Sequence, residues 1–216
     1  DRDADIDPTQ QPPPVALHVP SSAVPFDKPS WRAYCRRHMR AMNPTARHQH
    51  STSLADQVTA LAMRCDATMV ALYSAIGSET DSRPLANTLV VQGISLAYPR
   101  LSADGANMDF VACQGPGYLK ARPRSRLMEP QGPALAPERI DLVVVPAMAV
   151  DHTLARLGRG GGHYDRWLPR LRDGAMTIAV VPSTCVVPWS PVESHDVRVD
   201  AVCTEQGLFG PAEDTR

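Results

Sequence analysis

IDLVVVPAM, residues 140–148, is an apolar run interrupted only by Asp141. It lacks the alternation of apolar and polar residues that a strand with one solvent-facing side shows. It is therefore typical of a central strand that is covered on both faces. The run MTIAVV at 176–181 has the same pattern. Together, the two runs predict a sheet buried between two layers of other elements.

Helical patterns separate the strand-like runs. Apolar residues recur at helical spacing over 28–42, 46–64 and 84–92, which predicts three helices. Further strands are predicted at 67–73, 94–98, 108–113 and 199–207. Because helices alternate with strands along the chain, we predict an α/β fold. We expect a three-layer sandwich with a mixed, largely parallel central sheet flanked by helices.

The two ends of this pattern define the domain organisation. Residues 1–27 are polar and then rich in proline, which predicts an extended N-terminal arm without a core of its own. Residues 28–216 then form the α/β domain. Within it, residues 114–139 concentrate proline and glycine, so we expect a long loop or flap there.

Composition excludes several classes of partner. The formal net charge is −1 with 21% charged residues, so no basic excess points to a nucleic acid or a membrane surface. No apolar run reaches the roughly 18 residues that a membrane helix needs, and the acidic start is unlike a signal peptide. The 5 cysteines are odd in number and lack the spacing of a zinc site, which favours reduced thiols. We expect a cytoplasmic protein, a monomer, whose partners are small molecules.

LGRGGGHYDRW, residues 157–167, is a glycine-rich segment directly before a helical pattern. It lacks the GK[ST] ending of a Walker A loop, and His163 stands where the dinucleotide pattern GxGxxG has its last glycine. Pattern alone therefore favours a simple turn. Bare glycines nevertheless let backbone N–H groups approach an anion, and Arg156 and Arg159 could add charged donors. A helix beginning near Asp165 would add the positive end of its dipole.

The wider sequence shows a family resemblance. DLVVVPAMAVDHTLARLGRGGGHYDRWL, residues 141–168, resembles the signature of the 5-formyltetrahydrofolate cyclo-ligase family, also called methenyltetrahydrofolate synthetase. Three more segments resemble motifs of that family in the same order: KPSWRAYCRRHMRAMNP (28–44), VALYSAIGSETDSRPL (70–85) and SPVESHDVRVDAVCTEQG (190–207). Four separated motifs in the right order are far more specific than one glycine loop.

The resemblance implies an ATP-dependent ligase. The family uses ATP and Mg²⁺ to convert 5-formyltetrahydrofolate to 5,10-methenyltetrahydrofolate, with release of ADP and phosphate. The formyl oxygen attacks the γ-phosphate, and N10 captures the phosphorylated imidate as the ring closes. Phosphorylation is needed because an amide oxygen is a poor leaving group. The transferred phosphoryl group requires positioning and positive charge more than a protein nucleophile.

The resemblance also implies roles for individual residues. Arg159 and Tyr164 would be catalytic. ATP would contact Lys28, Arg32, Arg156, Leu157, Gly158, Arg159, Gly160, Gly161, Gly162, His163 and Tyr164. The reduced folate would contact Ser74, Glu79, Arg159, Gly160, Gly161, Gly162 and His163. Magnesium would be held by Asp165 and Asp196, whose hard carboxylate oxygens suit that ion.

One departure from the family pattern keeps other functions open. His163 occupies the position of the family's first tyrosine after the glycines. It could replace that tyrosine's contacts, change the substrate preference or slow the reaction. The alternatives are a folate- or nucleotide-binding protein with little turnover and a sugar-phosphate enzyme on a related scaffold, since fold does not determine chemistry. Other polar residues have structural interpretations: Asp151 shapes a turn, and His48 and His50 lie at the surface.

Overall fold

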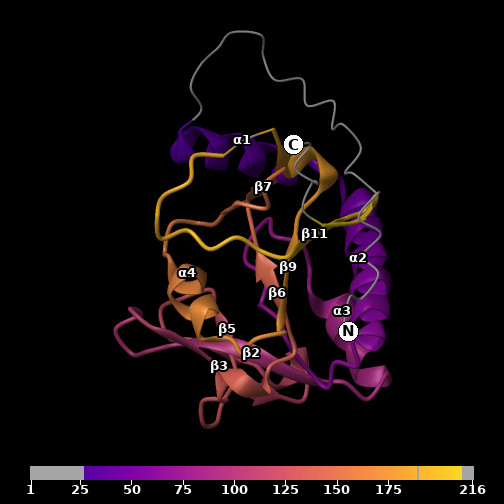
Figure 1. Cartoon of the computed structure of the whole chain (residues 1–216), viewed down its shortest axis with the longest axis vertical. Coiled ribbons are helices and arrows are strands. Elements are labelled where there is room, and N and C mark those ends of the chain that lie inside the picture. Colours follow the sequence, from indigo (N-terminus) through magenta and orange to yellow (C-terminus); the bar gives the residue numbers. More distant parts are fainter. Residues whose placement is uncertain (1–26, 189, 211–216) are drawn as a thin grey trace, which may run out of the picture.

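A seven-stranded sheet lies at the centre of the computed structural model, which describes residues 27–188 and 190–210 (Figure 1). The strands are β1 (Met69–Ala71), β2 (Ser95–Leu101), β3 (Met108–Cys113), β6 (Leu142–Pro146), β9 (Met176–Val180), β11 (Ala201–Thr204) and β12 (Gly207–Phe209). They lie in the order β12-β11-β9-β6-β1-β2-β3. All pairings from β11 to β2 are parallel, and the edge strands β12 and β3 pair antiparallel. The predicted mixed, largely parallel sheet is confirmed.

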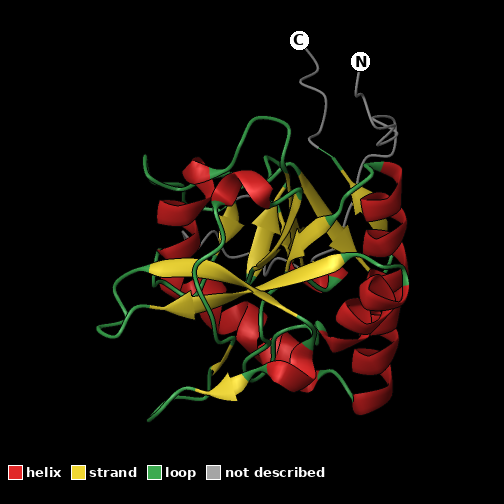
Figure 2. Ribbon diagram, turned by 90° about the horizontal axis from the view of Figure 1, so that it is seen from below, coloured by secondary structure: helices red, strands yellow, loops and turns green. Residues whose placement is uncertain are grey.

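Helices cover both faces of this sheet (Figure 2). They are α1 (Lys28–Ala41), α2 (Pro44–Arg64), α3 (Arg83–Val91) and α4 (His163–Trp167). α2 and α3 pack on the face that buries Leu142 and Val144, whereas α1 and α4 pack on the face that buries Val143 and Val145. Successive residues of β6 thus point into two different cores, which explains its unbroken apolar run. The predicted three-layer sandwich is confirmed.

Side-chain caps fix the start of the first two helices. Asp27 accepts a hydrogen bond from Ser30 N at 2.8 Å, and Asn43 accepts one from Ala46 N at 2.8 Å. A proline follows each cap within the first turn, where its missing N–H is not needed. α1 therefore begins where the sequence predicts, directly after Asp27, and α2 begins slightly earlier than predicted.

The long loop predicted at 114–139 is only partly irregular. It contains a hairpin of β4 (Lys120–Ala121) and β5 (Met128–Glu129) and two 3-10 turns, η1 (Pro116–Tyr118) and η2 (Pro137–Arg139). The helix predicted near Asp165 begins at His163 and has 5 residues. It continues as the 3-10 turn η3 (Leu168–Arg170), because Pro169 has no N–H with which to extend an α-helix.

A second, small sheet has no counterpart in the sequence predictions. It pairs β7 (Ala149–Asp151) with β10 (Val186–Val187) on one side and β8 (Arg156–Leu157) on the other. As expected, Asp151 shapes the turn between β7 and β8, because its Oδ1 accepts hydrogen bonds from Thr153 N and Ala155 N. Arg156 and Leu157 therefore belong to a strand that leads directly into the glycine loop.

The remaining predictions concern two histidines, the N-terminal arm and membrane spans. His48 is exposed as expected, but the surface position predicted for His50 is wrong, because its side chain is buried with 3% exposure. The extended arm predicted for 1–27 lies outside the described residues, apart from Asp27. None of the described helices is both long enough and apolar enough to cross a membrane.

Candidate active site

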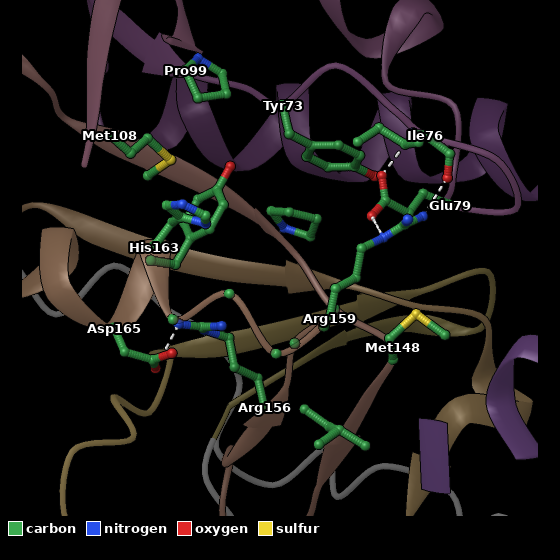
Figure 3. A pocket seen from close by; sticks show the side chains of 18 of the residues that line it. Tyr73, Ile76, Glu79, Pro99, Met108, Met148, Arg156, Arg159, His163 and Asp165 are labelled. Carbon is green, nitrogen blue, oxygen red and sulfur yellow. Dashed lines mark hydrogen bonds and ion pairs between the residues drawn. The ribbon is translucent and has the colours of Figure 1, made fainter. Parts of the chain in front are cut away.

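A cavity of about 600 Å³ opens at the carboxyl ends of β1 and β6. Ligands bind at this position in many α/β sheets, because loops from neighbouring strands meet there. Every residue to which the sequence assigns a site role lines the cavity: Lys28, Arg32, Ser74, Glu79, residues 156–165 and Asp196. The structure thus brings together residues from four distant segments of the chain. Figure 3 labels Glu79 from one of these segments and Arg156, Arg159 and Asp165 from another.

The glycine loop between β8 and α4 forms one wall of the cavity. Gly160 and Gly162 have φ angles of 103° and 64°, which other residues adopt only with strain. A Cβ atom on Gly161 would lie 2.7 Å from His163 Nδ1, and one on Gly162 would lie 2.6 Å from Arg166 Nη1. The loop therefore presents bare backbone to the cavity, and side chains at these positions would displace their neighbours.

Three cations of the cavity each pair with a carboxylate from another element. The pairs are Lys28 Nζ with Asp196 Oδ2 at 2.8 Å, Arg156 Nη2 with Asp165 Oδ1 at 2.8 Å, and Arg159 Nε with Glu79 Oε1 at 2.5 Å. Dashed lines in Figure 3 mark the last two pairs. An entering polyanion therefore has to compete with these three carboxylates for the cations. A metal ion that binds one of the carboxylates has to share it with the paired cation.

Arg156 is the most buried of these three cations, with 3% of its side chain exposed. Burial lowers the pKa of Arg156, and the neighbouring Asp165 carboxylate opposes that shift. Arg156 Nε has no acceptor among the described residues. The Tyr164 hydroxyl is also buried without a partner there, and burial raises the pKa of Tyr164, so this hydroxyl stays neutral. Two unsatisfied donors beside bare backbone fit an anionic ligand.

Two side chains of α1 extend toward the glycine loop and toward the segment before β11. Arg32 Nε donates to Gly158 O at 2.9 Å. Burial by itself lowers the pKa of Lys28, but hydrogen bonds to Asp196 and Glu193 outweigh it and raise the pKa above its usual value. Lys28 is therefore charged at neutral pH, and α1 adds its positive charge to the cavity beside the glycines.

Asp165 and Asp196 fit a magnesium ion by the chemistry of their oxygens. Asp165 accepts two hydrogen bonds at Oδ1, one of them from Val197 N at 3.1 Å, and its Oδ2 has no donor in the described part of the chain. Asp196 accepts from Lys28 Nζ and Glu193 N at Oδ2. Mg²⁺ is commonly held by one or two carboxylates, with water as its other ligands. The Val197–Asp165 bond also keeps the two aspartate segments adjacent.

The hairpin between β2 and β3 borders the cavity on another side. His163 Nε2 lies 2.9 Å from Gly105 O, and Arg166 Nη2 donates to Ala106 O at 3.0 Å. The apolar lining, to which the sequence assigns no site role, includes Tyr73, Pro99, Leu101, Met108, Met128 and Met148. Its only sequence signal is position, because most of these residues lie in or directly after strands. An apolar slot beside polar groups suits a flat ring system.

The comparison with known proteins agrees with this geometry. Residues 26–205 match the sequence profile of the 5-formyltetrahydrofolate cyclo-ligase family. The chain belongs to this family. It is 39% identical to the 5-formyltetrahydrofolate cyclo-ligase of Mycolicibacterium smegmatis over 141 residues, which cover 62% of this chain and 72% of that one. It is 25% identical to the protein of the same name from Mus musculus over 187 residues, covering 81% and 91%.

A solved cyclo-ligase relative has the same fold. The NMR structure of Aquifex aeolicus 5,10-methenyltetrahydrofolate synthetase aligns with a TM-score of 0.74 at 27% identity, covering 88% of this chain and 94% of that one. The family resemblance stated from the sequence is therefore confirmed. The four segments that resemble cyclo-ligase motifs each supply part of one cavity: α1, the turn after β1, the glycine loop and the segment before β11.

Proposed function

We propose that this chain is an ATP- and Mg²⁺-dependent 5-formyltetrahydrofolate cyclo-ligase. It converts 5-formyltetrahydrofolate to 5,10-methenyltetrahydrofolate and releases ADP and phosphate. The observation that supports this most directly is the meeting of four separate cyclo-ligase motifs at one cavity of about 600 Å³. The relatives from Mycolicibacterium smegmatis and Mus musculus carry the name of the same activity.

In this proposal, the triphosphate of ATP binds at the glycine loop. Bare backbone there lets N–H groups reach phosphate oxygens, and Arg156 gains at Nε the acceptor that it lacks among the described residues. Lys28 and Arg32 add positive charge from α1. The full set of proposed ATP contacts is Lys28, Arg32 and residues 156–164.

The reduced folate binds next to the triphosphate in this proposal. Glu79 can accept a pair of N–H donors from the pteridine ring, because an ionised carboxylate has two acceptor oxygens. Ser74 and the loop from Arg159 to His163 complete the polar contacts. The apolar lining that includes Tyr73 and Met108 covers the ring face.

Asp165 and Asp196 would hold the magnesium ion. When bound, Mg²⁺ neutralises charge on the triphosphate. The two aspartates would hold the ion next to Arg156 and Lys28, the cations with which they already pair. Because the pairs already exist, the carboxylates are oriented toward the cavity before any ligand enters.

The reaction follows from this placement. The formyl oxygen on N5 attacks the γ-phosphorus of ATP, the bond to the bridging oxygen breaks, and ADP leaves. N10 then attacks the formyl carbon and loses its proton. The carbon–oxygen bond breaks, and phosphate departs with the formyl oxygen. Arg159 supplies positive charge near the transferred phosphoryl group, and the neutral Tyr164 hydroxyl donates a hydrogen bond.

A coupled assay tests the proposed function. The chain is incubated with 5-formyltetrahydrofolate and MgATP, and the growth of methenyltetrahydrofolate absorbance is compared with the ADP formed. We expect the two to appear in equal amounts. Folate binding by calorimetry without ADP formation would instead favour a binding protein, and sugar-phosphate binding without ATP affinity would favour the other scaffold function. The cytoplasmic location and the monomeric state stay predictions.

A further inference from the structure

A buried histidine outside the cavity holds the turn that carries Glu79. His50 lies on α2 with 3% of its surface exposed. Its Nε2 lies 3.0 Å from Thr80 Oγ1, and its Nδ1 lies 3.1 Å from Glu205 Oε2. Thr80 directly follows Glu79 in the chain, whereas His50 itself does not line the cavity. A change at His50 therefore reaches the site only through its partners.

The turn after β1 is closed by its own hydrogen bonds. Tyr73 Oη donates to Thr80 O at 2.8 Å, and Ser82 Oγ donates to Tyr73 O at 2.6 Å. Glu79 Oε2 accepts from Ile76 N at 2.7 Å (Figure 3). The Thr80 carbonyl thus accepts from Tyr73, which lines the cavity, and the Thr80 hydroxyl contacts His50, so Thr80 connects the turn to α2.

His50 bridges Thr80 and Glu205, and the Glu205 end of this histidine bridge is also fixed. Glu205 lies in the turn between β11 and β12, and its carboxylate accepts from Ser183 N at 3.0 Å and from Ser183 Oγ. Ser183 begins the 3-10 turn η4 (Ser183–Cys185). Gln57 Nε2, from the same helix as His50, donates to Thr204 O at 3.0 Å. The bridge therefore connects the turn after β1, which forms part of the cavity wall, to a firmly bonded neighbour.

The chemistry of the two partners orients the imidazole. An ionised carboxylate only accepts, so the Nδ1 of His50 carries the proton toward Glu205. In the neutral ring Nε2 then accepts, and the Thr80 hydroxyl donates to it. Each contact between Thr80, His50 and Glu205 thus has one donor and one acceptor. A buried polar network of this kind fixes the geometry of the turn that it holds.

We propose that His50 is a positioning residue for folate binding: through Thr80 it holds the turn that presents the Glu79 carboxylate to the pteridine ring. This inference rests on the proposed function, because it needs Glu79 to contact the folate. Of the cations assigned to the triphosphate, Lys28 and Arg156 bind other elements and have no bond to this network, whereas Arg159 bonds to Glu79 and Ile76 of the turn. Loss of the bridge therefore weakens folate binding more than it weakens nucleotide binding.

Matched variants of both bridge residues test the role of His50. Thr80→Val removes the hydroxyl and keeps the shape of the side chain, and Thr80→Ser keeps the hydroxyl. His50→Asn retains a donor near the position of Nδ1 and loses Nε2. His48→Ala changes an exposed histidine of the same helix. For each full-length protein, the melting temperature and the Kd of 5-formyltetrahydrofolate and of MgADP are measured.

We expect Thr80→Val and His50→Asn to raise the folate Kd about tenfold or more, while the MgADP Kd stays within about twofold of wild type. Thr80→Ser and His48→Ala keep both Kd values near those of wild type. If His50→Asn does not fold, Thr80→Val decides alone. Unchanged folate affinity in the folded variants, or equal weakening of folate and MgADP, overturns the inference. A wild-type protein that binds no folate overturns instead the proposed function on which it rests.

Discussion

Arg159 Nε lies 2.5 Å from Glu79 Oε1 across a separation of 80 residues in the chain. Arg159 also donates through Nη2 to Ile76 O, so two bonds tie the glycine loop to the turn after β1. In the proposed function, Glu79 contacts the folate, and Arg159 contacts the phosphate as well as the folate. The folate therefore competes with Arg159 for the Glu79 carboxylate. The phosphate of ATP competes with Glu79 for the Arg159 guanidinium.

Replacing Glu79 by Gln tests this competition. We expect weaker folate binding, by about tenfold or more, because the ring donors lose a charged acceptor. ATP binding should become slightly tighter, by up to about fivefold, because Arg159 is half-exposed and its released ion pair is worth little. Calorimetry with each ligand alone measures both. Asp81→Asn, in the same turn and paired with Arg83, is the control, and equal losses for both ligands would contradict the competition.

The left-handed glycines make a second prediction. Gly162→Ala should lower the free energy of unfolding by about 1–2 kcal/mol, because a Cβ is strained at a φ of 64°. The new Cβ also meets Arg166 Nη1, so Arg166 has to leave its bonds to Gly161 O and Ala106 O. We therefore expect ATP affinity to fall as well.

Gly174→Ala separates stability from binding. Gly174 has a φ of 79°, so the same substitution carries a similar strain, but it does not line the cavity. Denaturant unfolding and ATP calorimetry on both variants give the comparison. Similar losses of ATP affinity at the two positions would show that the glycine loop has no special part in binding.

A third prediction concerns the proposed magnesium ligand. Asp165→Asn keeps an oxygen for Val197 N but removes the charge that faces Arg156. We expect the Mg²⁺ concentration needed for half-maximal turnover to rise about tenfold or more. The control is Asp109→Asn, which breaks an exposed pair with Arg170 outside the cavity. An unchanged Mg²⁺ requirement, with the fold intact by circular dichroism, would reject Asp165 as a ligand.

Glu205 gives a prediction for acid stability. Burial by itself raises the pKa of Glu205, but hydrogen bonds from His50 and Ser183 outweigh it and hold the pKa at about 2, below the usual 4.5. Because the folded-state pKa is lowered, this carboxylate stabilises the protein fully above about pH 5 and loses that contribution as the pH falls from 4.5 toward 2.

Glu205→Gln removes this titration. We expect the variant to be less stable than wild type at neutral pH and the difference to shrink as the pH falls through that window. Denaturant unfolding at a series of pH values measures it. A stability difference that stays constant down to the lowest pH would show that the ionised carboxylate contributes nothing.

The main layers of the fold were predictable because their signals are local. The strand β6 is apolar on both faces. Consecutive residues such as Val143 and Val144 therefore predict its burial between two helix layers. The strands of the small sheet have only 2 or 3 residues each, which is too short for a periodic pattern. Their pairing joins three separate segments of the chain, at 149–151, 156–157 and 186–187.

The parts of the site that lie in a sequence motif could be predicted. The parts that depend on tertiary contacts could not. The glycine loop and its flanking arginines stand out in the sequence, and all of them line the cavity. His50 lies in the polar first part of the helix predicted at 46–64, and its burial depends on Thr80 and Glu205, 30 and 155 residues away. Tyr73 is both a core side chain and a cavity wall, and a strand pattern cannot separate these two roles.

The path of the formyl oxygen distinguishes the proposed reaction from simple ATP hydrolysis, because the formyl oxygen has to take the phosphoryl group from ATP. The substrate is 5-formyltetrahydrofolate labelled with ¹⁸O in the formyl group, turned over with unlabelled MgATP in unlabelled water. We expect one ¹⁸O atom in each phosphate released, measured by mass spectrometry. Unlabelled phosphate formed in step with methenyltetrahydrofolate would contradict the proposed reaction, because water would then have received the phosphoryl group.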